Sequence, residues 1–179
     1  MATNIIKNCL ITKSDCKIIK PFIDNVKSYQ YRLYKGYHPG IDLECKTVYA
    51  PCNTTMLYQG YDEDRRRCIV LQYDGDICLR FSNLSSISLK NEFQKVYKGD
   101  ELGKCNKFVH FEILSYFIQS DWRVRVLDRE YSKLDPTAHA QPDYAWNLQS
   151  IYRNNPLLDD GSIELDDSIQ TEFESEVRH

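Results

Sequence analysis

The sequence has 179 residues, of which 42% are hydrophobic and 12% aromatic, and this suffices for one domain with a buried core. A multi-domain enzyme does not fit in this length, and no apolar run approaches the ~18 residues that a membrane-spanning helix needs. The net charge of −3 is uneven, because residues 137–179 carry nine acidic residues against two arginines, which leaves residues 1–136 at +4. We therefore predict no nucleic-acid partner and no membrane insertion.

The N-terminal residues combine apolar pairs with Lys7, Asn8 and Lys13, so they lack the apolar stretch of a signal peptide. We therefore expect a protein made in the cytoplasm. Seven cysteines are scattered without a CxxC pair, and an odd number cannot pair completely within one chain. We predict reduced, half-buried thiols, and the alternative is a disulfide or a thiolate metal ligand.

Three segments are predicted along the chain: an N-terminal segment at residues 1–19, a folded domain at 20–136 and an acidic extension at 137–179. Between residues 40 and 118, short runs of Val, Ile, Tyr and Phe recur roughly every ten residues between turn signals. This spacing is typical of an antiparallel, all-β domain.

Two turns stand out within this domain. Asp74-Gly75 lies between two apolar runs and predicts a tight hairpin, because this pair readily adopts positive φ angles. The charged residues 62–67 are predicted to form a solvated turn, with an anion-binding loop as the alternative.

The extension after Pro136 is polar and acidic. Residues 143–153 fit one short helix with Asp143 as its N-cap. The acidic residues beyond it predict a tail that is disordered alone or docks on another protein chain.

His38-Pro39-Gly40-Ile41-Asp42 is the first pattern that suggests chemistry. Pro-Gly favours a turn, in which Pro fixes φ and Gly supplies a positive φ. The following strand points Ile41 one way and Asp42 the other, so a turn histidine and a strand aspartate can converge on one point. Imidazole and carboxylate are both ligands suited to zinc.

The second pattern is the alternating run of residues 108–113. Val109 and Phe111 face the core, which leaves Phe108, His110 and Glu112 together on the opposite face of a strand. His110 can therefore meet His38 and Asp42.

Five motifs in order resemble the lysostaphin/LytM family of zinc endopeptidases over residues 20–136. They are residues 37–43 (YHPGIDL), 48–51 (VYAP), 81–84 (FSNL), 98–103 (KGDELG) and 109–113 (VHFEI). The resemblance implies a small antiparallel β-sheet or half-barrel with a metal in a groove on its face.

In that family, an HxxxD motif and the second histidine of HxH bind zinc, which implies His38, Asp42 and His110 as ligands here. Three protein ligands leave a fourth position for water, whose pKa zinc lowers toward ~7. An empty, relic site is the alternative for a protein that has lost catalysis.

The sequence departs from the family at both catalytic histidines. The first histidine of HxH is Phe108 here, and the histidine of the family's other active-site motif is Asn83. Phe cannot exchange a proton, and Asn is no base near neutral pH. Glu112 lies on the metal face and is the alternative base.

These features predict a degenerate LytM-like domain that acts as a structural or cell-wall-binding module. The setting expected from the resemblance is a bacteriophage tail tip or baseplate, with protein partners bound through residues 137–179. The first alternative is an active zinc endopeptidase that cleaves peptide cross-links in peptidoglycan. The second is a lipoyl- or biotinyl-type carrier domain, which would need a modifiable lysine such as Lys90 or Lys95 at a hairpin tip.

Overall fold

In the computed structural model, residues 4–22, 38–116, 118–120, 123–142, 146, 151 and 163–165 are described. Their regular secondary structure consists almost entirely of antiparallel strands, which confirms the predicted all-β class. The described helical structure is confined to Ile151 and a 3-10 turn, η2, and no described helix is long and apolar enough to cross a membrane.

Eleven strands form one sheet, and two further strands pair separately. The larger sheet contains β1 (Ile5–Cys9), β2 (Ser14–Lys20), β3 (Ile41–Glu44), β4 (Thr47–Tyr49), β5 (Thr54–Tyr61), β6 (Arg67–Asp74), β7 (Ile77–Ile87), β8 (Lys95–Val96), β9 (Glu101–Ser115), β11 (Arg123–Val126) and β12 (Arg129–Leu134). The separate pair is β10 (Ile118–Ser120) with β13 (Ile163–Leu165), and η2 spans Thr137–Ala140.

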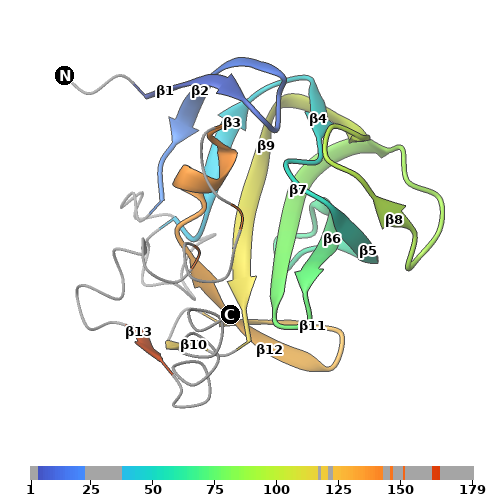
Figure 1. The fold of residues 1–179 in the computed structure, drawn as a ribbon, viewed down its shortest axis with the longest axis vertical. Coiled ribbons are helices and arrows are strands. Elements are labelled where there is room, and N and C mark those ends of the chain that lie inside the picture. Colours follow the sequence, from blue (N-terminus) through green and yellow to red (C-terminus); the bar gives the residue numbers. More distant parts are fainter. Residues whose placement is uncertain are drawn as a thin grey trace, which may run out of the picture.

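Strand β9 is the centre of the sheet (Figure 1). One of its edges pairs along most of its length with β7. The other edge is shared in turn by β4, β3 and β12. Four segments that are distant in the sequence therefore meet on one strand.

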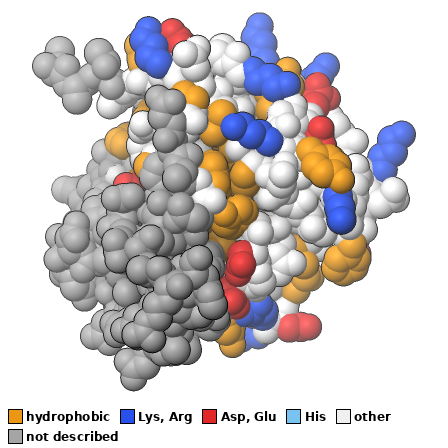
Figure 2. All heavy atoms as spheres, viewed as in Figure 1, with side chains coloured by type: hydrophobic (Ala, Val, Ile, Leu, Met, Phe, Trp, Pro, Cys, Tyr) orange, Lys and Arg blue, Asp and Glu red, His pale blue; other side chains and the backbone are white. Residues whose placement is uncertain are grey.

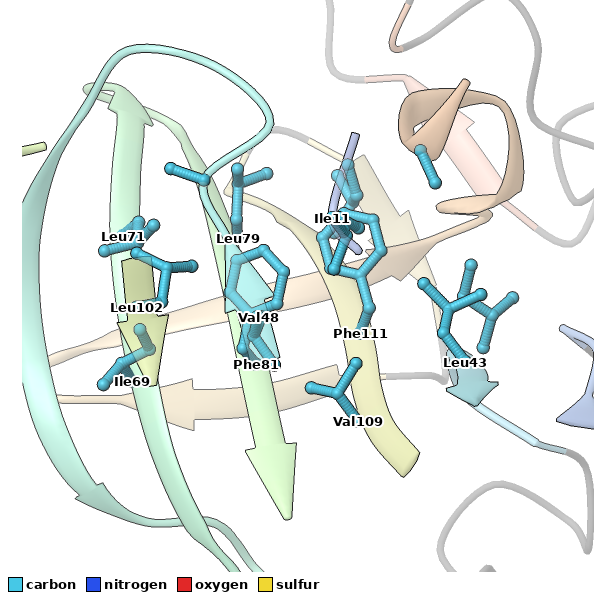
Figure 3. Packing of buried hydrophobic residues seen from close by; sticks show 14 of the residues in the cluster. Ile11, Leu43, Val48, Ile69, Leu71, Leu79, Phe81, Leu102, Val109 and Phe111 are labelled. Atoms are coloured by element: carbon cyan, nitrogen blue, oxygen red, sulfur yellow. The ribbon is translucent and has the colours of Figure 1, made fainter. Parts of the chain in front are cut away.

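The main core lies on one face of this sheet. It is built from the alternating apolar positions of the strands, as the period of two predicts. Phe81 of β7 stacks on Phe111 of β9, with ring centroids 4.8 Å apart, and Val109 and Leu43 lie beside them (Figure 3). Burial of these side chains fixes the register, because a slip by one residue would turn each of them to the other face.

The opposite face carries a second, smaller apolar cluster. It contains Val70, Cys78 and Leu114, and the β11 and β12 hairpin covers it with Val126 and Tyr131. The candidate site lies on this same face, where β3 pairs with the middle part of β9.

The segments outside the predicted domain, residues 1–19 and 137–179, both contribute residues to the sheet or to its core. The β1 and β2 hairpin extends the sheet, because Ile18 pairs with Leu43 of β3. After η2, Trp146 and Ile151 pack against the main core, and the hydroxyl of Tyr73 donates a hydrogen bond to the Trp146 carbonyl. Most of the predicted helix at 143–153 and of the acidic tail lies outside the described residues.

The predicted hairpin at Asp74-Gly75 is confirmed, but the expected positive φ angles are not, because neither residue has one. Asp74 pairs with Ile77, and the two loop residues are Gly75 and Asp76. The carboxylate of Asp74 accepts a hydrogen bond from the Asp76 backbone N–H at 3.2 Å, which closes the turn. On the face that Figure 2 shows, Lys and Arg side chains are scattered over the described surface, with Asp and Glu among them.

Candidate metal centre

The turn before β3 brings His38 against β9. Position 40 must be a glycine because β9 passes close to it: a Cβ atom there would lie 2.5 Å from the Phe111 carbonyl oxygen and 2.9 Å from the His110 ring. The sequence analysis predicted a positive φ as the reason for this glycine. That reason was wrong, since Gly99 is the positive-φ glycine among the described residues.

Asp42 and His110 lie directly opposite each other on β3 and β9. Residues opposite each other on antiparallel strands project to the same face, so the carboxylate and the imidazole meet. The Nδ1 atom of His110 is 2.7 Å from Oδ1 of Asp42, a hydrogen-bond distance.

His38 completes the group from the turn. Its Nε2 lies 3.3 Å from the same Oδ1 of Asp42, and its Nδ1 lies 3.0 Å from the Pro21 carbonyl. A carbonyl only accepts hydrogen bonds, so Nδ1 carries the proton and Nε2 presents its lone pair toward Asp42. His38, Asp42 and His110 are hereafter the ligand group.

All three side chains of the ligand group are buried, with His38 and His110 at 0% exposure and Asp42 at 4%. Burial lowers the pKa of His38. Burial also acts to lower the pKa of His110, but hydrogen bonds to Asp42 and Glu112 outweigh it and raise that pKa. Burial acts to raise the pKa of Asp42, but the hydrogen bond from His110 and the proximity of both imidazoles outweigh it and lower that pKa.

The donor atoms fit a divalent metal. Each residue offers one ligand atom, and these atoms lie within 4.8 Å of one another. Tetrahedral zinc with bonds near ~2.0 Å holds its ligand atoms about 3.3 Å apart, which matches the spacing of His38 and Asp42. The shorter contact, between His110 and Asp42, contains a proton that a metal would displace, so metal binding would release a proton.

Beside the ligand group lies a set of four charged side chains, hereafter the charge cluster: Glu63, Arg80, Glu112 and Lys133. Arg80 pairs with Glu112, and the Lys133 ammonium donates to Glu112 at 2.6 Å and to Glu63 at 3.0 Å. Two cations and two anions balance, as buried charges must.

The turn predicted at residues 62–67 is present, and Arg66 pairs with Asp62 and Asp64 within it, but the turn is only partly solvated. Asp62 is buried, and it caps the turn by accepting hydrogen bonds from the backbone of Asp64 and Arg66 at 2.9 and 2.8 Å. The Glu63 side chain is only 24% exposed, because it turns inward to Arg80 and Lys133. Attraction to Lys133 and Arg80 outweighs burial and lowers the pKa of Glu63 to about 2.

Glu112 connects the two sets, since its Oε2 lies 3.1 Å from Nε2 of His110. Burial acts to raise the pKa of Glu112, but Arg80 and Lys133 hold it well below its usual value. The carboxylate therefore stays ionised and is a weak proton acceptor. It orients His110 and partners the two cations.

Asn83 and Phe108, which the resemblance aligns with the family's two catalytic histidines, lie next to each other. Asn83 adopts a positive φ of 70° in an irregular part of the β7 and β9 pairing. Its side-chain amide donates a hydrogen bond to the Phe108 carbonyl at 2.9 Å. Both residues are half-buried, and the Asn83 amide is used to fix the backbone of β9.

Ser82 is a neighbour that the sequence analysis did not identify. It lies opposite His110 on β7, so its hydroxyl projects to the same face. Its oxygen is buried and has no hydrogen-bond partner among the described residues. The alternation of residues 77–87 would have placed Ser82 and Arg80 on the face of the site.

Two alternatives from the sequence were a thiolate metal ligand and a carrier domain with a modifiable lysine. Cys45 contacts the main core, on the face opposite Asp42, as strand alternation predicts. Lys95 is part of β8 and pairs with Thr55, and the backbone N–H of Lys90 is bonded to Gln94. Neither lysine stands at the tip of a two-residue hairpin.

No protein-family model and no curated protein matches the sequence. Solved structures do match. The solution structure of lysostaphin has a TM-score of 0.52 at 15% identity and covers 76% of this chain and 55% of that chain. A structure of the SpoIIQ-SpoIIIAH pore-forming complex has a TM-score of 0.54 at 16% identity and covers 86% of this chain and 99% of that one.

A zinc-containing peptidase from Vibrio cholerae has a TM-score of 0.48 at 17% identity, over 63% of this chain and 37% of that one. The chain thus spans about half the length of the lysostaphin chain that it matches, at 55%. At these identities the likeness shows the fold. The chain has the fold of lysostaphin and LytM-type peptidases, which confirms the predicted resemblance at that level.

Proposed function

We propose that this chain is a degenerate LytM-like domain that binds zinc through the ligand group and acts as a structural or cell-wall-binding module. The observation that carries the proposal is the contrast within one site. The ligand group is assembled, with its donor atoms within 4.8 Å of one another. Both positions that hold catalytic histidines in the family are occupied by Phe108 and Asn83.

Loss of hydrolysis follows from what these two side chains can do. Phe108 has no group that exchanges a proton, and the Asn83 amide is bonded to the backbone of β9. General acid–base groups each contribute roughly 10²–10⁴ to a rate, so the loss of both removes several orders of magnitude. Glu112 offers no replacement, because Arg80 and Lys133 hold its carboxylate.

Metal content measured by native mass spectrometry tests the metal half of the proposal. We expect one zinc per wild-type chain and none in His110→Ala or in Asp42→Asn, which keeps the shape of the side chain. His139→Ala is the matched control, because His139 is also buried but lies outside the ligand group, so it should retain zinc. Metal-free wild type in zinc-containing buffer would contradict this part.

The second candidate is an active zinc endopeptidase, and the intact ligand group is the observation that favours it. If the chain is an active enzyme, wild type should release peptidoglycan fragments, and this release should stop on chelation and in His38→Ala. If the chain is a binding module, neither wild type nor His38→Ala should release fragments, and both should still bind purified cell wall or join their assembly. Hydrolysis by the zinc-loaded wild type would overturn the module proposal.

The partner is proposed to be another protein, bound through residues 137–179. One structural neighbour is part of a pore-forming complex of two proteins, which supports a scaffold of this kind. A bacteriophage tail tip or baseplate is the setting proposed from the sequence resemblance. Truncation after Tyr152 should abolish assembly while the β-sheet stays folded, and an assembled truncated protein would contradict the role of the tail.

A further inference from the structure

Cys45 and Cys105 meet at the edge of the main core, away from the ligand group. Their sulfur atoms are 3.0 Å apart, and the Cys105 sulfur also lies 3.1 Å from the Cys45 carbonyl oxygen. Two backbone hydrogen bonds hold the segments together: Cys45 donates to the Lys107 carbonyl at 3.0 Å, and Cys105 to the Lys46 carbonyl at 2.8 Å. The two thiols are thus fixed in contact by the sheet.

A bulge in β9 creates this contact. Glu44 pairs with Phe108 and Thr47 pairs with Lys104, so two residues on one side face three on the other. The extra residue is accommodated by the positive φ of Lys107, at 74°. The bulge turns Cys105 toward the link between β3 and β4.

Cys45 is the more accessible of the two residues. It is half-buried and lines an open cavity of about 570 Å³, whereas Cys105 is only 5% exposed. Glu44, Lys46 and Lys107 line the same cavity. Their two cations outnumber the one carboxylate, and a net positive charge attracts anionic reagents.

The two sulfur atoms lie within hydrogen-bond distance of each other, and either one can be the donor. A hydrogen bond from Cys45 lowers the pKa of Cys105, and the same contact raises the pKa of Cys45. Isolated thiols in this protein behave differently. Burial raises the pKa of both Cys52 and Cys68 to about 12, so these thiols stay protonated.

We propose that Cys45 and Cys105 are a redox-active thiol pair that closes reversibly to a disulfide by exchange with a small anionic disulfide such as glutathione disulfide. Cys45, the more exposed of the two thiols, loses its proton, and its thiolate attacks one sulfur of glutathione disulfide and expels one glutathione thiolate, which takes up a proton. Cys105 then loses its proton, attacks the Cys45 sulfur and expels the second glutathione. In total the protein loses two protons and two electrons, and glutathione disulfide gains both to give two molecules of glutathione.

The test uses the full chain with glutathione disulfide at neutral pH and a chelator present, so that the result does not depend on the metal centre. After quenching by alkylation, peptide mass mapping identifies linked and free cysteines. We expect wild type to lose two hydrogen atoms and to yield one linked peptide pair containing Cys45 and Cys105. Reduction with dithiothreitol should restore both thiols.

Single substitutions assign the steps. Cys105→Ser should accumulate a glutathione adduct on Cys45, because the second attack is removed, and Cys45→Ser should form no linked pair. Cys52→Ser is the matched control and should behave as wild type. Native wild type in which Cys45 is alkylated but no linked pair forms would overturn the proposal. The buried thiols of Cys9 and Cys16 also contact each other, and a bridge between them as the main product would overturn it as well. Since both outcomes are read from wild type, the test holds even if a variant fails to fold.

Discussion

Two buried polar sets lie next to each other on the same face of the sheet, and they are balanced in different ways. The charge cluster contains two cations and two anions that pair within it. The ligand group has one carboxylate and two imidazoles, and its donor atoms converge on one point. The charges of the charge cluster neutralise one another, whereas the ligand group is completed when it binds a cation.

The difference teaches how one face can hold both stability and binding. Burying a charge is costly unless it is paired, so the charge cluster stabilises the fold only while all of its members are present. The ligand group can exchange a proton for a metal without disturbing that balance. Four predictions can break or sharpen this contrast, from the largest expected effect to the smallest.

Removing one cation from the charge cluster should have the largest effect. Lys133→Met leaves Glu63 and Glu112 with Arg80 alone, and breaking a buried pair typically costs about 3–5 kcal/mol. Urea unfolding measures this loss. The exposed Lys95→Met is the control and should change stability by less than about 0.5 kcal/mol. A loss below about 1 kcal/mol in Lys133→Met would show that the cluster is not needed for folding.

Adding zinc should stabilise the protein through the ligand group. At a free zinc concentration of about 100 times Kd, binding to the native state alone contributes about 2.7 kcal/mol. The unfolding midpoint of wild type should therefore rise with zinc, and that of Asp42→Asn should not. An equal rise in both proteins would place the binding outside the ligand group.

Acidification should reveal the role of Glu63. Its pKa falls from an ordinary value of 4.5 to about 2, so its stabilising contribution is present above pH 4.5 and is lost as the pH falls toward 2. This shift corresponds to at most about 3 kcal/mol, and solvent screening of the partly exposed carboxylate reduces it to about 1–2 kcal/mol.

Glu63→Gln removes this titration, which gives a direct comparison. The difference in unfolding free energy between wild type and Glu63→Gln should be largest above pH 5 and shrink toward pH 2. A constant difference across this range would mean that the Glu63 charge does not stabilise the fold.

The smallest effect is expected at Ser82. Its hydroxyl is buried without a hydrogen-bond partner among the described residues, so Ser82→Ala removes a desolvated polar atom. We expect stability between unchanged and about 1 kcal/mol higher in urea unfolding. The exposed Ser86→Ala on the same strand is the control. A clear loss of stability in Ser82→Ala alone would show that the hydroxyl has a structural role.

The sequence predicted what depends on local pattern. Alternation in residues 108–113 placed His110 on the face opposite the core, and the HPGID motif placed His38 and Asp42 near it. The structure brings these three residues together, and their role as ligands stays a prediction. The all-β class followed from the spacing of apolar runs in the same way.

The charge cluster could not be predicted from the sequence, because it depends on contacts between residues that are distant in the chain. Lys133 reaches Glu112 because β12 pairs with β9, and Glu63 reaches both cations because its turn folds back over the sheet. A run of mixed charges in residues 62–67 looks like a solvated turn, because its ionic partners are distant in the sequence. The reason for Gly40 was equally hidden, since it is the neighbouring strand and not the turn that excludes a side chain.

The position of β9 in the chain has a consequence for biogenesis. Strands β3, β4 and β7 all lie before β9 in the chain but pair with it, so none of them has its central neighbour until β9 itself is being made. Such non-local pairing slows folding and leaves unpaired strand edges exposed in the meantime. The nascent chain therefore acquires His110, the last residue of the ligand group, together with the central strand of its sheet.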